Sequence, residues 1–143
     1  LGGILIKEIL ESATEIAKTS ASIILQPMRD SFKLRSWLLK NSFIIKDVDI
    51  IKDKGKFYET IWVKPGCALK EDQIASYVDI RLINKKNPLI LEYIDMEIKK
   101  YKTIVNKLAR PRTPNAISRL KECNEILEYY KEVKTWMWQN AKQ

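Results

Sequence analysis

The sequence predicts an α/β domain followed by an antiparallel pair of long helices. The first 66 residues suggest a short β-branched strand, then a helix, then a β-hairpin. After residue 87, apolar residues recur at helical spacing over two long stretches. With 45% hydrophobic and 31% charged residues, the 143-residue chain has the composition of a folded protein. We therefore expect a sheet domain over residues 1–69 and a helical domain over residues 70–143.

The first elements follow from local patterns. Residues 4–18 place isoleucine, leucine and alanine at helical spacing, so they predict one helix. Ser22–Leu25 is short, apolar and β-branched, which predicts a strand buried on both faces, and Pro27 ends it. Asp30 or Ser31 is then expected to cap a second helix, which stops at Asn41.

A β-hairpin is expected over residues 43–64. Two β-rich runs flank the sequence DKGK at residues 53–56, which places Gly55 in a tight turn. A strand–helix series that finishes in an antiparallel hairpin is typical of the doubly wound sheet of S-adenosylmethionine-dependent methyltransferases. This is a likeness of fold, which does not by itself give a function.

Two long helices are expected in the second half. Asn87-Pro88 and Thr113-Pro114 are helix starts, and residues 109–112 break the pattern between them. The expected apolar seams are Leu91, Ile94, Ile98, Tyr101, Val105 and Leu108, and then Ile117, Leu120, Leu127, Tyr130, Val133 and Met137, with Asn124 as a polar interruption. A short connection requires the helices to pack antiparallel, as a coiled-coil hairpin. Acidic residues on both helices disfavour the alternative of a membrane-surface helix.

Charge and composition restrict the function. Thirteen of the 26 Lys and Arg residues but only 7 of the 18 Asp and Glu residues follow Ile83, so most of the net charge of +8 lies there. Two interpretations of this charge are about equally supported: a polyanionic partner such as RNA, or a lysine-rich surface that is simply solvated. The absence of histidine excludes Ser-His and Cys-His catalysis and the usual zinc sites.

The cysteines and the hydropathy indicate the compartment. Cys67 and Cys123 are 56 positions apart, which is neither a metal-site spacing nor a disulfide framework. We therefore expect reduced thiols in a cytoplasmic protein, with one of them packed. No apolar run approaches 18 residues, so no membrane-spanning segment is expected.

Four segments together resemble the bacterial tRNA (adenine-22-N1)-methyltransferase family. They are LGGILIKEILE, IILQP, LRSWLLKNSF and DKGKFYETIWVKPG, in this order between Leu1 and Gly66. Beyond Gly66 the likeness is one of architecture, a connector and two helices. The resemblance implies a Rossmann-like class I methyltransferase domain, S-adenosyl-L-methionine as cofactor, and methylation of adenine N1 in tRNA.

The resemblance also implies that the chain is a C-terminal fragment. Gly2-Gly3 would end a glycine-rich turn after a central strand, and the main cofactor-binding loop would precede Leu1. The fragment alone is expected to be inactive. The strand at Ser22–Leu25 would have an open edge, which a homodimer or another oligomer is expected to cover.

The resemblance and the predicted end of the first strand together suggest candidate site residues. Gln26, at the end of the first strand, matches the donor and acceptor pattern of adenine and is the candidate catalytic residue; the alternative is that its amide only satisfies loop backbone. Gly2 and Gly3 are candidates for backbone approach to the cofactor or the base, and the alternative is a turn that enters the first helix. Arg29 is either a phosphate ligand or a surface residue. A second set of candidate RNA ligands is expected towards the tip of the helical hairpin: Lys99, Lys100, Lys107, Arg110 and Arg112.

Three other residues are interpreted as structural. Arg35 is expected to form an ion pair, and Tyr58 and Glu59 are expected to serve packing and surface roles. The alternative functions for the whole chain are a non-catalytic RNA-binding module, or a helical interaction module with no nucleic-acid partner.

Overall fold

The computed structural model describes residues 1–67 and 76–141. Its two compact units are Leu1–Asn87 and Pro88–Gln143. The expected domain boundary at residues 69 and 70 lies outside the described residues. The first unit also contains α4 (Ile80–Asn84), which the sequence-based boundary would assign to the helical domain.

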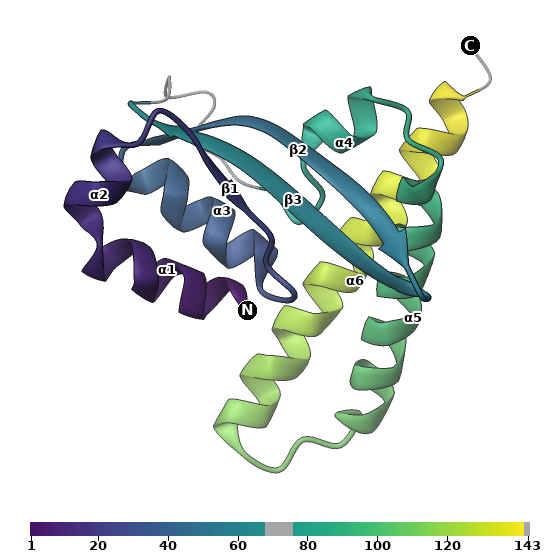
Figure 1. Cartoon of the computed structure of the whole chain (residues 1–143). Coiled ribbons are helices and arrows are strands. Elements are labelled where there is room, and N and C mark those ends of the chain that lie inside the picture. The colour runs from purple at the N-terminus through teal and green to yellow at the C-terminus, as the bar shows by residue number, and fades with distance from the viewer. Residues whose placement is uncertain (68–75, 142–143) are drawn as a thin grey trace. The chain divides into compact units, whose positions relative to one another are not determined.

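The first unit is built around a three-stranded sheet with the order β1-β3-β2 (Figure 1). The strands are β1 (Ile23–Leu25), β2 (Phe43–Asp53) and β3 (Lys56–Pro65). Because β3 pairs antiparallel with both neighbours, β1 and β2 are parallel to each other although β3 separates them. The sequence therefore predicted the strand–helix–hairpin order correctly.

The hairpin turn and a β-bulge fix the register of the sheet. Lys54 and Gly55 both have positive φ, 48° and 78°, which is the conformation of a tight hairpin turn. Lys46 is the extra residue of a bulge, since Ile45 pairs with Val63 and Asp47 pairs with Trp62. The bulge reverses the alternation of side chains along β2, so Ile45 and Val48 are both buried.

One face of the sheet forms the core of this unit. Paired residues on that face are buried or half-buried, among them Leu25 opposite Ile61 and Ile61 opposite Val48. On the other face, Ile24 is 75% exposed and its partner Trp62 is 46% exposed. The expectation that the first strand is buried on both faces is therefore wrong, because a strand in a one-sided sheet alternates between core and solvent.

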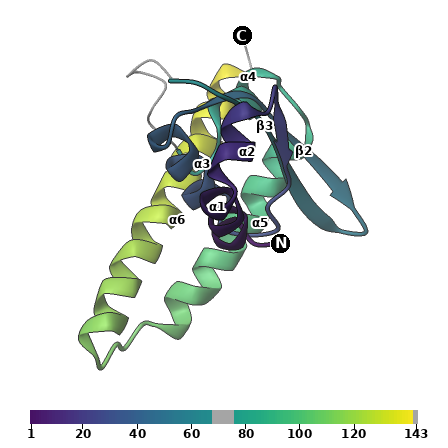
Figure 2. The same ribbon diagram turned by 60° about the vertical axis from the view of Figure 1, so that its left-hand side comes forward.

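Helices cover the buried face. The helix α3 (Ser31–Lys40) contacts α1 (Gly3–Ser12) and β2, and α1 and α3 lie side by side (Figures 1 and 2). The single helix expected over residues 4–18 is in fact two, α1 and α2 (Thr14–Thr19), separated at Ala13. The Ser12 and Thr14 hydroxyls donate to the carbonyls of Ile9 and Glu11, and such local bonds compete with a continuous helix.

The second unit is an antiparallel pair of helices, α5 (Leu89–Lys107) and α6 (Pro114–Asn140), that lie side by side (Figures 1 and 2). The helix α6 starts at Thr113-Pro114 as predicted, and the Thr113 hydroxyl caps it by accepting a hydrogen bond of 3.1 Å from the Ala116 amide. The supercoiled packing of a coiled coil stays a prediction.

The seam of α6 differs from the expected one. The buried residues are Cys123, Ile126, Leu127 and Tyr130, whereas Ile117 is 56% exposed. Asn124 is exposed and does not interrupt the seam, because Cys123 lies one turn before Leu127 and faces inward in its place. The expectation of one packed cysteine is confirmed.

Candidate functional site

The candidate site lies where β1 ends and the chain turns into α3. The backbone of residues 28 and 29 is hydrogen-bonded to that of residues 1 and 3. The Met28 amide donates to the Leu1 carbonyl, and the Gly3 amide donates to the Arg29 carbonyl, both at 2.8 Å. These bonds bring together three of the predicted site elements, namely the glycine pair, Arg29 and the loop that carries Gln26.

Gly3 has a structural reason to lack a side chain. A Cβ atom at Gly3 would lie 2.6 Å from the Asp30 carbonyl oxygen, which is too close for any side chain. At Gly2 the nearest atom would be Nε of Arg29 at 3.0 Å, which belongs to a side chain that is 84% exposed and free to move. The space beside Gly3 is therefore filled by the chain itself and does not form a cradle for a cofactor.

Gln26 is exposed, whereas the next residue, Pro27, is buried. Buried Pro27 anchors the loop and fixes its direction. The Gln26 amide makes no hydrogen bond to any residue that the structure describes. The alternative in which Gln26 serves loop backbone is therefore not supported, and its donor and acceptor are available to a ligand.

Asp30 and Arg29 complete this loop. Asp30 stands at the N-cap position of α3 in a left-handed conformation, with φ of 56°, but its side chain does not cap the helix. Its carboxylate instead lies 3.5 Å from the Lys33 ammonium and 4.0 Å from the Arg29 guanidinium. Contacts at these distances on a surface are weak, so Arg29 remains available to an anion.

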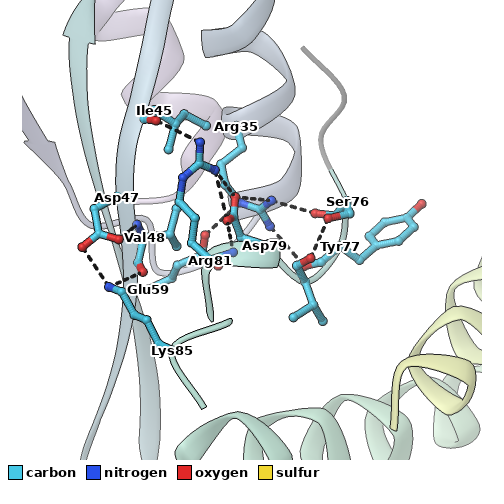
Figure 3. A network of polar contacts seen from close by, with 11 residues as sticks. Arg35, Ile45, Asp47, Val48, Glu59, Ser76, Tyr77, Asp79, Arg81 and Lys85 are labelled. Atoms are coloured by element: carbon cyan, nitrogen blue, oxygen red, sulfur yellow. Dashed lines mark hydrogen bonds and ion pairs between the residues drawn. The ribbon is translucent and has the colours of Figure 1, made fainter. Parts of the chain in front are cut away.

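A buried polar network lies on the helix-covered side of the same sheet (Figure 3). Arg35 on α3 is 1% exposed, and its Nε lies 2.8 Å from a carboxylate oxygen of Glu59 on β3. This contact is held by charge, since neither atom has an aligned hydrogen bond. The two terminal nitrogens of Arg35 donate to the carbonyls of Ser76 and Tyr77, at 2.7 and 3.1 Å.

Asp79 connects this network to α4. It lies 3.7 Å from Arg35, accepts a bond of 2.9 Å from the Arg81 amide, and also pairs with the Arg81 guanidinium (Figure 3). Arg81 in turn donates to the Ile45 carbonyl beside the bulge. The network thus fastens the chain before α4, and α4 itself, to the sheet.

The electrostatics of the network indicate a structural role. Burial raises the pKa of Glu59, and the positive charge of Arg35 opposes that shift. Just after α4, the hydrogen bond that Lys85 donates to Asp47 on β2 lowers the pKa of Asp47. The interpretation of Arg35 as an ion-pairing residue is confirmed. The surface role expected for Glu59 is wrong, because this residue is 8% exposed and paired.

The predicted basic residues of the helical pair do not form one cluster. Lys107 ends α5, and Arg110 and Arg112 lie in the exposed connection to α6. Lys99 and Lys100 are about two turns away, roughly 12 Å along the helix. Lys100 contacts buried Glu97 at 2.5 Å and lies over the Tyr101 ring. These contacts hold Lys100 in the helix surface, so the exposed tip consists of Lys107, Arg110 and Arg112.

Residues 1–67 and 76–141 contain no group of three or more Cys, Asp and Glu side chains that could hold a metal ion. None of the helices in this part of the chain is long and apolar enough to cross a membrane.

Comparison with known proteins connects this arrangement to one family. Residues 1–132 match the family model TrmK, tRNA (adenine(22)-N(1))-methyltransferase. A Bacillus subtilis tRNA (adenine(22)-N(1))-methyltransferase is 28% identical over 144 residues, covering 93% of this chain. The chain spans only 58% of that relative's length.

Solved structures give the same result. The crystal structure of the B. subtilis M1A22 tRNA methyltransferase TrmK superposes with a TM-score of 0.75 at 26% identity, covering 94% of this chain and 60% of that one. A candidate tRNA (m1A22) methyltransferase of Streptococcus pneumoniae, solved in complex with S-adenosyl-L-methionine, gives a TM-score of 0.72 at 26% identity. It covers 94% of this chain and 56% of that chain. By its matched sequence and its fold, the chain belongs to the tRNA (adenine(22)-N(1))-methyltransferase family.

Proposed function

We propose that this chain forms the substrate-side part of an enzyme that methylates adenine N1 in tRNA, with S-adenosyl-L-methionine as the methyl donor. The observation that carries the proposal is Gln26, exposed and without a partner among the described residues, at the carboxyl end of β1. Ligands of open α/β sheets bind at such strand ends. The family match over residues 1–132 supplies the reaction class.

Gln26 is proposed to position the substrate base. A glutamine amide offers one donor and one acceptor, which complement the edge of adenine. Adenine N1 already carries a lone pair, so transfer of a methyl group to it depends on positioning more than on acid–base catalysis. The absence of histidine from the chain agrees with that requirement.

We propose S-adenosyl-L-methionine as the methyl donor of the enzyme, but we assign no binding pocket for it within these 143 residues. The S. pneumoniae relative was solved with S-adenosyl-L-methionine, which supports the same cofactor here. Gly2 and Gly3 remain candidates for its backbone contacts. The Cβ space of Gly3 is filled by Asp30, however, so the residues present do not fit the cofactor as a cradle.

The basic residues are proposed as tRNA contacts. Arg29 lies beside the candidate site, and Lys107, Arg110 and Arg112 form the tip of the helical pair. Exposed cations of this kind bind phosphates without regard to base sequence. The proposal places the protein in the cytoplasm, in agreement with the free thiols of Cys67 and Cys123.

Substitution of Gln26 tests the proposed function. In the full-length methyltransferase, Gln26→Ala is expected to lower the rate of N1-methyladenine formation about 10- to 100-fold, because one orienting contact is lost. The product is measured in tRNA by mass spectrometry. Gln139→Ala, at an exposed glutamine on α6, is the matched control and should leave the rate unchanged.

The outcome separates the candidate functions. Equal rates for Gln26→Ala and Gln139→Ala would contradict the role of Gln26. Absence of any tRNA methylation by the wild-type protein, together with intact tRNA binding, would favour the non-catalytic RNA-binding module instead.

A further inference from the structure

The exposed side of β1 continues past the end of the strand. Leu25 and Pro27 are buried, whereas Ile24, Gln26 and Met28 are exposed. This alternation is that of an extended chain, in which every second side chain points to the same side. A residue before proline is held in an extended conformation, so Pro27 maintains the alternation at Gln26. The side chains of Gln26 and Met28 therefore lie on one side of the chain, roughly 7 Å apart at the backbone.

The backbone of Met28 is fixed, although its side chain faces solvent. The loop after β1 lies beside the start of α1 (Figures 1 and 2), where the Met28 amide donates to the Leu1 carbonyl and the Arg29 carbonyl accepts from the Gly3 amide, both at 2.8 Å. The Met28 side chain itself is 61% exposed. One exposed apolar residue is ordinary on a protein surface, so its meaning depends on the groups beside it.

The neighbours of Met28 supply the polar contacts that a nucleotide requires. Gln26 offers an amide donor and acceptor on the same side, and Arg29 carries an exposed guanidinium. Phe32, the aromatic residue next along the chain, contacts the Tyr77 ring, at 4.2 Å between ring centroids. Met28 is therefore the side chain between Gln26 and Phe32 that offers exposed apolar surface to a ligand.

Recognition of a base requires such an apolar surface. An enzyme that modifies a base of a folded nucleic acid holds it outside the stack, by hydrogen bonds to its edge and by aromatic or apolar side chains against its ring faces. An amide satisfies only the edge. A methionine side chain is unbranched and carries a polarisable sulfur, so it adapts to an aromatic ring and makes favourable contact with it. Contact with a ring face also favours a purine over the smaller pyrimidine, because more apolar area is buried.

We infer that Met28 packs against the ring face of the adenine whose edge Gln26 contacts, and that the two residues determine specificity together. This inference rests on the proposed function, since it assigns a further contact with the same substrate base. The Gln26 amide distinguishes adenine from guanine at the edge, and Met28 favours a purine over a pyrimidine at the face. The phosphate beside that base is left to Arg29.

Steady-state methylation by the full-length enzyme tests the inference. Met28→Ala is expected to lower kcat/KM for tRNA about 5- to 30-fold, because the apolar contact with the base is lost. Met28→Leu keeps a similar apolar volume and should stay within about 2-fold of the wild type. Ile16→Ala is the matched control, since it removes an exposed apolar side chain of the same unit, on α2. Thermal unfolding should give similar midpoints for all four proteins, because both positions are exposed.

A second measurement separates a contact with the base from a structural effect. Binding of unmodified tRNA is compared with binding of the same tRNA made abasic at the adenine that the enzyme methylates. The wild type should prefer the tRNA that contains adenine, Met28→Ala should lose much of that preference, and Met28→Leu should retain it. If Met28→Ala weakens binding of both tRNAs equally, Met28 contacts another part of tRNA and the inference is wrong.

The proposed function and the inference fail in different ways. If the wild type methylates tRNA and Gln26→Ala is impaired, but Met28→Ala matches Ile16→Ala, the inference is wrong and the proposed function stands. A Met28→Leu variant as slow as Met28→Ala would also contradict the inference, since apolar volume would not then restore the contact. If the wild type forms no N1-methyladenine in tRNA, both are wrong.

Discussion

At the scale of single residues, close backbone contacts and buried charges decide where substitutions are tolerated. Gly2 and Gly3 are adjacent in the sequence, yet only Gly3 lies against backbone. Arg35 and Arg29 are both arginines near α3, yet only Arg35 is buried and paired. Sequence patterns cannot separate such neighbours, because the difference arises from segments that meet only in the folded chain.

The two glycines give the first prediction. Gly3→Ala is expected to lower the free energy of unfolding by about 1 to 3 kcal/mol, because its Cβ would overlap the Asp30 carbonyl and force the loop to move. Gly2→Ala should be nearly neutral, since only the mobile Arg29 side chain must shift. Urea denaturation measures both, and equal midpoints for the two variants would contradict the prediction.

The buried ion pair gives the second prediction. Arg35→Met leaves Glu59 buried with the charge opposite it removed, and it deprives the Ser76 and Tyr77 carbonyls of their donor. The free energy of unfolding is expected to fall by about 3 to 5 kcal/mol, as it does when other buried ion pairs lose one partner.

A second substitution provides the control. Arg35→Met/Glu59→Gln should recover part of the lost stability, because the neutral amide of the glutamine replaces a buried carboxylate that had no counter-charge. The comparison is made by urea denaturation in a double-mutant cycle. If Arg35→Met lowers the free energy of unfolding by less than about 1 kcal/mol, this network does not contribute substantially to stability.

At the scale of elements, the bulge in β2 keeps the hydrophobic face of the hairpin continuous. Ile45 and Val48 are three residues apart, an odd spacing that would place them on opposite faces of a regular strand. The extra residue Lys46 restores both to the core. The bulge also lies where Arg81 of α4 donates to the Ile45 carbonyl, so it links strand geometry to the position of α4.

Deletion of Lys46 is the third prediction. Without this residue, either the residues before it or those after it turn to the wrong face of the sheet. We expect loss of cooperative unfolding, or a destabilisation of more than about 3 kcal/mol, since several apolar side chains would be exposed. Lys46→Ala keeps the chain length at an exposed position and should be tolerated. Circular dichroism during thermal unfolding distinguishes the two variants.

At the scale of the whole molecule, the division into units changes the account of charge. Residues 1–87 contain 15 Lys and Arg and 11 Asp and Glu, and residues 88–143 contain 11 and 7, so each unit carries +4. Lys85 belongs to the first unit and is paired there with Asp47 and Asp49. The expectation that most of the net charge lies in the helical part therefore holds for a boundary after Ile83 but not for the boundary between the two units.

The open edge of the sheet gives the fourth prediction. Within the described sheet, β1 pairs on one side only, and Ile24 is 75% exposed. Unpaired strand edges associate with other chains. We propose that the 143-residue chain forms a homodimer or another oligomer through this edge, and sedimentation velocity should show a species larger than 16.7 kDa. Ile24→Lys should shift the chain towards the monomer, whereas Ile16→Lys, at an exposed position on α2, should not. A monomer at all concentrations would refute the proposal.

The sequence by itself determined the strands, the longer helices, their order and the family, although it did not predict the break between α1 and α2. Proline, glycine and β-branched residues act locally, so the strand before Gln26-Pro27, the turn at Gly55 and the start of α6 at Thr113 could all be predicted. The combination of IILQP, LRSWLL and GKFYE also sufficed for the family, which the match over residues 1–132 confirms. Gln26 could be predicted as a candidate because a polar amide before proline ends an apolar strand, and its role stays a prediction.

Only the tertiary structure decided which residues meet. The contact of Gly3 with Asp30, the pairing of Arg35 with Glu59, and the role of Asp79 join segments between 24 and 44 positions apart. Lys99 and Lys100 look alike in the sequence, yet one lines an open groove and the other is held by Glu97. The physical reason is that burial and electrostatic pairing depend on distances between distant segments, which local patterns do not encode.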